Sequence, residues 1–118
     1  MPFKFENLKV WQASLDLADA VDSIAMRFPK HELYSLASQI KRAADSVSLN
    51  IVEGSTGQSN AEFKRFLRYS NRSALEVVGA LYLAKRRNYI NEDQFNQLYH
   101  QIETLVKMIQ ALINSIKE

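Results

Sequence analysis

Apolar residues recur at spacings of three and four along almost the whole chain, and this periodicity limits the folds that the chain can adopt. Such spacing places side chains on one face of an α-helix, whereas a half-buried strand needs alternation at every second residue. No stretch shows strand alternation, a linker or an internal repeat. The pattern therefore predicts an all-α protein with four amphipathic helices, over about residues 8–28, 32–53, 60–87 and 92–117.

Residues that favour helix ends separate the four segments. Pro29 follows the first, and Gly54 ends the second, where we expect it to supply the positive φ of a C-terminal cap. Ser59 and Asn91 are each followed three residues later by Glu or Gln, which is the spacing of a capping box at a helix N-terminus. Because short connections make neighbouring helices antiparallel, we expect residues 1–118 to form one domain, an antiparallel up-down-up-down four-helix bundle.

Composition removes several classes of protein. The chain has 118 residues, enough for one core, and no cysteine, so neither a disulfide framework nor a thiolate metal site is expected. The first residues lack the pattern of a signal peptide, and no apolar run reaches about 18 residues, the length of a membrane span. We therefore expect a cytoplasmic protein without a membrane partner.

Catalytic and metal-binding patterns are sparse. A di-metal carboxylate site in a helical bundle needs glutamates followed three residues later by histidine, and no glutamate here has that neighbour, so no metal or other cofactor is expected. The segment 54–60, GSTGQSN, lacks the lysine of a phosphate-binding P-loop. His31 and His100 are expected to be ordinary surface residues.

Glu53 is the one carboxylate considered for catalysis. No nucleophile or histidine lies near it in the sequence, so we expect it to pair with Arg42 or with a base of a neighbouring helix. No catalytic residue is predicted, and an enzyme centred on Glu53 is the weakest of the alternatives.

Basic residues concentrate in the third predicted helix. Residues 61–90 contain seven basic and two acidic residues, although the net charge of the whole chain is only +2. Five of the cations fall in one arc opposite the apolar face, where they can follow a phosphate backbone or simply face solvent. Leu75 and Tyr82 share this arc, which indicates that another chain covers part of it. The predicted nucleic-acid-binding stripe consists of Lys64, Arg65, Arg68, Arg72 and Arg86.

Small and polar side chains form a second row, on the flank of the second predicted helix. Their 4-3-4 spacing allows another helix to approach closely, either within the bundle or from another subunit. The first predicted helix also presents apolar residues on more than one side, so we expect a homo-oligomer. The row, called the seam below, consists of Gln39, Ala43, Ser46 and Asn50.

Several motifs together resemble one known family, in order and spacing, across residues 3–116. They are F-x-x-L-x-V-W from Phe5, F-P-x-x-E-x-Y-x-L from Phe28, Q-x-x-R-A-A from Gln39 and S-x-x-x-N-I-x-E-G from Ser46. The combination resembles the four-helix bundle proteins of the 23S rRNA intervening-sequence family.

The resemblance implies a small bacterial homo-oligomer, a ring of five subunits, in a family with no established enzymatic activity. Relatives include the accessory protein of diversity-generating retroelements, which associates with a reverse transcriptase and nucleic acid. By position in the motifs, Arg42, Asn50 and Glu53 are the polar members, with a structural role or a role at a subunit contact. We therefore predict a non-enzymatic, oligomeric adaptor associated with RNA or with a nucleic-acid-processing protein. The alternative is a protein–protein scaffold that binds no nucleic acid.

Overall fold

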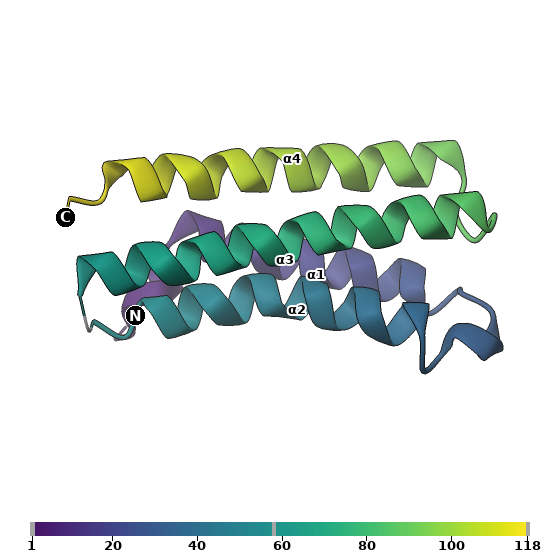
Figure 1. Ribbon diagram of the computed structural model, residues 1–118, viewed down its shortest axis with the longest axis horizontal. Helices are drawn as coiled ribbons and strands as arrows, with labels where there is room; N and C mark the ends of the chain where they lie inside the picture. The colour runs from purple at the N-terminus through teal and green to yellow at the C-terminus, as the bar shows by residue number, and fades with distance from the viewer. Residues whose placement is uncertain (1, 58, 118) are drawn as a thin grey trace.

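The computed structural model describes residues 2–57 and 59–117, and over these residues its regular structure is entirely helical (Figure 1). The prediction of an all-α protein with four helices is confirmed for this part of the chain. The elements are a 3₁₀ turn η1 (Lys4–Asn7), α1 (Lys9–Ala25), a second 3₁₀ turn η2 (Lys30–Glu32), α2 (Leu36–Gly54), α3 (Asn60–Arg86) and α4 (Glu92–Ser115).

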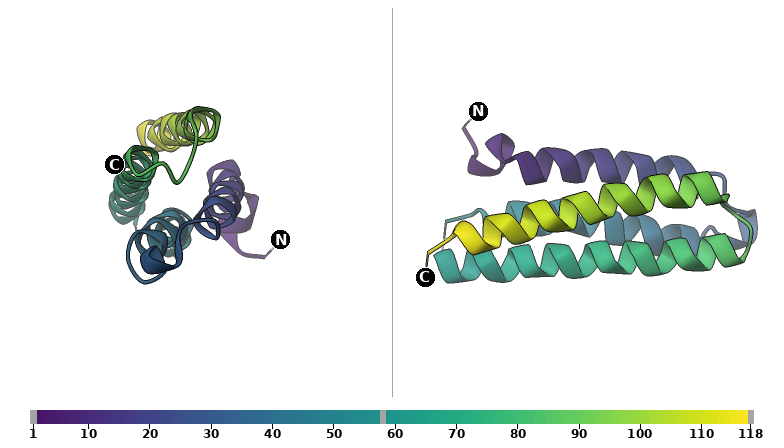
Figure 2. Two further views of the ribbon diagram at one scale, coloured as in Figure 1. Left: turned by 90° about the vertical axis from the view of Figure 1, so that its right-hand side faces the viewer. Right: turned by 90° about the horizontal axis from the view of Figure 1, so that it is seen from above.

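The four helices lie along the long axis of a molecule that measures 44 × 23 × 22 Å. Figure 1 shows the α1–α2 and α3–α4 connections at one end of the bundle and the α2–α3 connection at the other. Helices α2 and α4 therefore run in the same direction along this axis. Seen end-on in Figure 2, the helices occupy the four corners of the bundle in the order α1, α2, α3, α4, so the α1–α2 face lies opposite the α3–α4 face.

The core is formed by the apolar stripes, one from each helix, that the periodicity predicts. A few buried residues are polar, and their side chains are hydrogen-bonded: the Ser14 hydroxyl donates to the Trp11 carbonyl oxygen within α1, and the Ser70 hydroxyl of α3 donates to the Val47 carbonyl oxygen of α2. Leu33, which lies in the connection before α2, is exposed although it is apolar. The largest fully buried side chains are Leu17, Val21, Leu36, Ile40, Val47, Ile51, Leu67, Val77, Leu81, Ile102, Leu105 and Ile109.

The predicted N-terminal caps of the last two long helices are present. Asn91 and Gln94 form a complete capping box, in which each side-chain oxygen accepts from the other residue's backbone N–H at 2.8 Å. Ser59 Oγ accepts from the backbone N–H of Glu62 at 3.0 Å, which is one half of the expected box. These hydrogen bonds satisfy donors that a helix start leaves free.

The predicted role of Gly54 is wrong. Gly54 is the last residue of α2, and among the described glycines the positive φ belongs to Gly57, at 89°. What α2 needs at position 54 is the absence of a side chain, since a Cβ there would lie 2.7 Å from Phe66 Cβ and 3.3 Å from the Phe63 carbonyl oxygen. Glycine thus allows α2 and α3 to approach closely at this end of the bundle.

The second helix starts later than predicted, at Leu36 rather than near residue 32. Glu32 Oε1 accepts from the backbone N–H of Leu36 at 3.2 Å, so this carboxylate satisfies a free donor at the start of α2 from outside the helix. The first helix ends at Ala25, before the predicted residue 28, and Phe28 packs into the core from the connection.

Candidate functional site

The basic stripe lies on the outer side of α3, where Arg65, Arg68, Arg72 and Arg86 are exposed. Lys64 is half-buried and already takes part in an interaction. Arg65, Arg68 and Arg72, called the arginine cluster below, span about 10 Å of helix, and Arg86 lies about 21 Å further along. The exposed arginines of the stripe therefore form two separate groups, the arginine cluster and Arg86.

Aromatic rings position two members of the arginine cluster. The Arg65 guanidinium lies 5.4 Å from the centroid of the Phe66 ring, and the Arg72 guanidinium lies 5.8 Å from that of Tyr69. Both distances are in the range of cation–π contacts. Among residues 2–57 and 59–117, no carboxylate oxygen lies within 4.0 Å of the three guanidinium groups. None of the three positive charges is therefore held in an ion pair within the described part of the chain.

Other basic residues of the same helix and its C-terminal cap are used inside the protomer. Lys85 Nζ lies 3.1 Å from Glu92 Oε2 and 4.4 Å from the centroid of the Phe95 ring. Arg87 Nη1 donates to Glu32 Oε2 at 2.9 Å. The number of basic residues in 61–90, seven, therefore overstates the positive charge that α3 offers to a partner.

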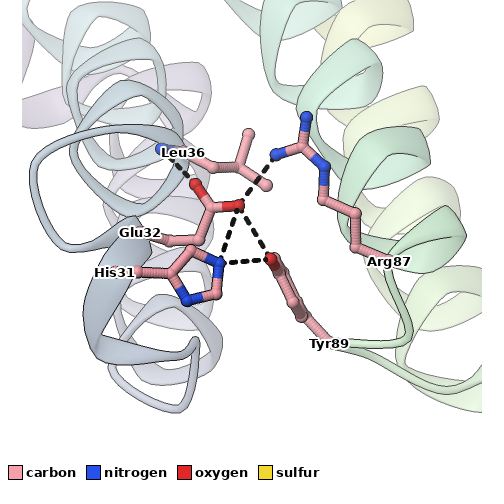
Figure 3. Close-up of polar contacts among 5 residues, drawn as sticks. All are labelled: His31, Glu32, Leu36, Arg87 and Tyr89. Atoms are coloured by element: carbon pink, nitrogen blue, oxygen red, sulfur yellow. Dashed lines mark hydrogen bonds and ion pairs between the residues drawn. The ribbon is translucent and has the colours of Figure 1, made fainter.

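A polar cluster connects the two loops at one end of the bundle (Figure 3). The buried carboxylate of Glu32 accepts from Tyr89 Oη at 2.8 Å and from Arg87, both of which belong to the α3–α4 connection. His31 Nε2 lies 3.2 Å from Tyr89 Oη and 3.9 Å from Glu32 Oε2, although the imidazole is largely exposed. We call His31, Glu32, Arg87 and Tyr89 the end cluster.

Hydrogen bonds shift the pKa values of Glu32 and Tyr89 in opposite directions. The bond from the Tyr89 hydroxyl is the main cause of a lowered pKa of Glu32, and the Leu36 N–H and the Arg87 guanidinium act in the same direction against the effect of burial. The same bond raises the pKa of Tyr89, because its hydroxyl must keep its proton to donate. The arrangement stabilises a charged carboxylate next to a neutral phenol.

Sequence reasoning missed this cluster. Arg87 and Tyr89 are 55 and 57 residues away from Glu32 in the chain, so no local spacing pairs them. The only signal in the sequence is the glutamate in the F-P-x-x-E-x-Y-x-L motif, and this signal does not identify the partners.

The seam lies along the α2–α3 face. Gln39 is exposed, Ala43 is buried, and Ser46 and Asn50 are half-buried, with Asn50 Nδ2 donating to the Ser46 carbonyl oxygen at 2.8 Å. An open groove of about 530 Å³ runs beside the first three. The remaining residues that line it are Tyr34, Ser35, Arg42 and Glu76.

The polar members of the family motifs do not form a common site. Arg42 Nη2 donates to Ser38 Oγ at 3.3 Å, and Glu53 is exposed about 16 Å further along α2. Glu53 does not form the expected ion pair: no Lys, Arg or His nitrogen of the described residues lies within 4.0 Å of its carboxylate. In the same part of the chain, no group of three or more His, Asp or Glu side chains is placed to hold a metal ion. No helix there is long and apolar enough to cross a membrane.

Comparison with known proteins agrees with the motifs and the fold. A structure from Bacteroides thetaiotaomicron, described as a protein of unknown function from the S23 ribosomal protein family, superposes with a TM-score of 0.83. The alignment covers 90% of this chain and 96% of that chain at 24% sequence identity, so the similarity concerns the fold. No functionally curated protein has significant sequence similarity to the chain. The family model described as "23S rRNA-intervening sequence protein" matches residues 6–111. The chain therefore belongs to the 23S rRNA-intervening sequence protein family.

Proposed function

We propose that this protein is a non-enzymatic adaptor that binds RNA or a ribonucleoprotein through the outer face of α3. The single observation that supports this proposal best is the arginine cluster, whose three exposed guanidinium groups have no carboxylate oxygen within 4.0 Å in the described part of the chain. Two of them lie over aromatic rings, which limits the side-chain freedom that binding would remove. Arg86 and Lys64 complete the proposed surface at its two ends.

The proposed working unit is a homo-oligomer in the bacterial cytoplasm, a ring of five antiparallel up-down-up-down bundles. Family membership and the exposed apolar residues of α3 support the assembly. Repetition of the arginine cluster around a symmetry axis would strengthen the field that attracts a polyanion. Contacts of this kind, made by guanidinium groups to phosphates, favour backbone recognition over the reading of base edges.

A protein–protein scaffold without nucleic acid is the second candidate. The observation that favours it is the exposed apolar surface on the same helix, at Leu75, Tyr82 and Leu83. The two candidates differ in their response to salt, because release of counterions from phosphates makes RNA binding steeply salt-dependent.

The test is the simultaneous change of Arg65, Arg68 and Arg72 to Gln. We expect weaker binding of single-stranded RNA of any sequence, with the slope of log affinity against log salt smaller by about 2 to 3 per protomer engaged. The matched control changes Lys9, Arg27 and Lys117 to Gln; these residues are also exposed, so the control removes the same charge from other surfaces. Equal losses in both variants would mean that only net charge matters. Unchanged binding in the first variant would favour the scaffold.

A further inference from the structure

We propose that copies of this chain associate head to tail, with the α1–α2 face of one copy docked on the α3–α4 face of the next. This inference rests on the homo-oligomeric part of the proposed function and specifies which surfaces would make the contact. It depends on two unpartnered apolar surfaces, on their positions in the bundle and on the order of the charges beside them.

The first surface is on the α1–α2 face, near η2. Met26, Leu33 and Tyr34 are 76%, 55% and 92% exposed, which is unusual for three large apolar side chains close together in the chain. They border an open hollow of about 340 Å³ whose floor includes Ala25 and Ala37. We call Met26, Leu33 and Tyr34 the projecting surface.

The second surface is on the α3–α4 face. Leu75 and Tyr82 are 62% and 50% exposed on α3, about one and three turns beyond the arginine cluster. Beside Leu75 is a hollow of about 210 Å³, lined also by Val78, Tyr99 and Val106. We call Leu75, Tyr82 and this hollow the receiving surface.

The two surfaces lie on opposite faces of the bundle (Figure 2). Two different surfaces that bind each other form a heterologous contact, which leaves one free copy of each surface in every dimer. Such contacts continue until the chain of subunits closes into a ring or grows into a filament.

The surfaces also lie at the same level along the long axis, which favours closure. Glu76 of α3 lines the same groove as Ala43 of α2, so these positions are level with each other. Leu75, the neighbour of Glu76, lines a hollow with Ile102 of α4. The α2 residues beside the projecting surface and the α4 residues beside the receiving surface thus lie at the same height along the long axis. Adjacent subunits can therefore dock without sliding along this axis.

Charges at the edges of the two hollows are complementary in order. Lys41, Arg42 and Asp45 of α2 border the first hollow, where Arg42 donates to Ser38 of its own helix, and Glu103 and Lys107 of α4 border the second. The pairs compared are Lys41 with Asp45 and Glu103 with Lys107. Both pairs are four residues apart, about 6 Å along helices that run in the same direction. In subunits with parallel axes, Lys41 therefore meets Glu103 and Asp45 meets Lys107. Lys41 already lies 3.2 Å from Asp22 with both side chains about half exposed, so the new partner would extend an existing ion pair.

A mixing experiment tests the proposal in the full-length protein. One variant changes Met26 and Tyr34 to Asp, and the other changes Leu75 and Tyr82 to Glu. At micromolar concentration, we expect light scattering to give the protomer mass of 13.6 kDa for each variant alone. An equimolar mixture should give about twice that mass, because each variant supplies the surface that the other lacks. Circular dichroism of each variant must match that of the unchanged protein.

If a variant with a changed apolar surface does not fold, exchanging the charges of one predicted ion pair between subunits provides a second test. Lys41→Glu and Glu103→Lys each alter an exposed position, and each should reduce the oligomer mass. The double variant should recover it, since the pair is restored in reverse order. If the double variant associates again but the subunits do not close into a ring, light scattering will give a continuous series of masses instead of one finite mass.

The results separate failure of the inference from failure of the proposed function. If the unchanged protein is an oligomer and all variants keep its mass, the docking surfaces lie elsewhere and only the inference is overturned. If the unchanged protein has the protomer mass, the two surfaces serve another protein, and both the inference and the proposed assembly are wrong. RNA binding is measured independently by the arginine variants.

Discussion

Arg87 Nη1 donates to Glu32 Oε2 at 2.9 Å across 55 residues of sequence, and this bond fastens the α3–α4 connection to the turn that precedes α2. Tyr89 adds a second bond to the same oxygen at 2.8 Å. Both loops at this end of the bundle are therefore held by one buried carboxylate (Figure 3).

The end cluster should matter more for stability than its small size suggests. We expect Glu32→Gln to lower the melting temperature more than Tyr89→Phe, because it removes the counter-charge of Arg87 as well as the acceptor of the tyrosine. Calorimetry of the two variants measures the difference. Glu53→Gln, at an exposed glutamate of α2, is the matched control and should change little. Equal melting temperatures for Glu32→Gln and this control would contradict the role of the cluster.

The stabilisation from Glu32 should depend on pH. Its pKa in the folded protein is lowered, so the contribution is complete above the ordinary pKa of glutamate, about 4.3, and is lost as the pH falls through the lowered value. The pKa of Tyr89 is raised, so its contribution is complete below about pH 10 and is lost as the pH rises through the raised value. The melting-temperature gap between the unchanged protein and Glu32→Gln should therefore be widest between about pH 5 and 9. A gap that persists undiminished at pH 2 would refute this assignment.

Gly54→Ala should destabilise the protein by about 1–3 kcal/mol, because the added Cβ would lie 2.7 Å from Phe66 Cβ and force α2 and α3 apart. Urea unfolding gives the free energy directly. Gly79→Ala is the matched control, since its Cβ meets nothing within 4 Å, and helix propensity should make it more stable by about 0.5–1 kcal/mol. Two changes of the same sign would show that close approach is not what requires glycine at position 54.

Asn71→Ala should stabilise the protein, unlike most truncations of a partly buried residue. Asn71 Oδ1 is buried and has no hydrogen-bond partner among the described residues, so its removal eliminates a desolvated acceptor. Alanine is also the better helix former, and we expect a gain of about 1 kcal/mol in the free energy of unfolding. A loss of stability in chemical denaturation would mean that the amide has a partner in solution.

Ser46→Phe distinguishes the two interpretations of the seam. Ser46 lines the open groove on the α2–α3 face and is not part of the hollow that head-to-tail docking fills, although Tyr34 borders both. We therefore expect the variant to keep the oligomer mass in light scattering. Loss of the oligomer with retained helix content would instead place a subunit contact at the seam and contradict the docking that we infer.

Features that depend on local spacing were predictable, and features that depend on long-range partners were not. The Asn91 capping box follows from residues three apart, and the sequence alone identifies it. The sequence indicates that Gly54 ends α2 but not why glycine is required there, because the contact that excludes a side chain comes from Phe63 and Phe66 on the next helix. The basic stripe was found by helical geometry, but only tertiary contacts show that Arg87 is committed to Glu32 and that the arginine cluster is not paired in the same way.

The arginine cluster lies in the half of α3 nearer the α2–α3 connection, whereas the end cluster closes the opposite end. In a ring of subunits with parallel axes, every copy would carry its arginine cluster in the same half of the ring. The two ends of such a ring would differ: one would carry the arginine clusters, and the other would carry the end clusters, in which Arg87 is paired with Glu32. A polyanion would then be drawn to it from one side only, and the assembly would have a front and a back.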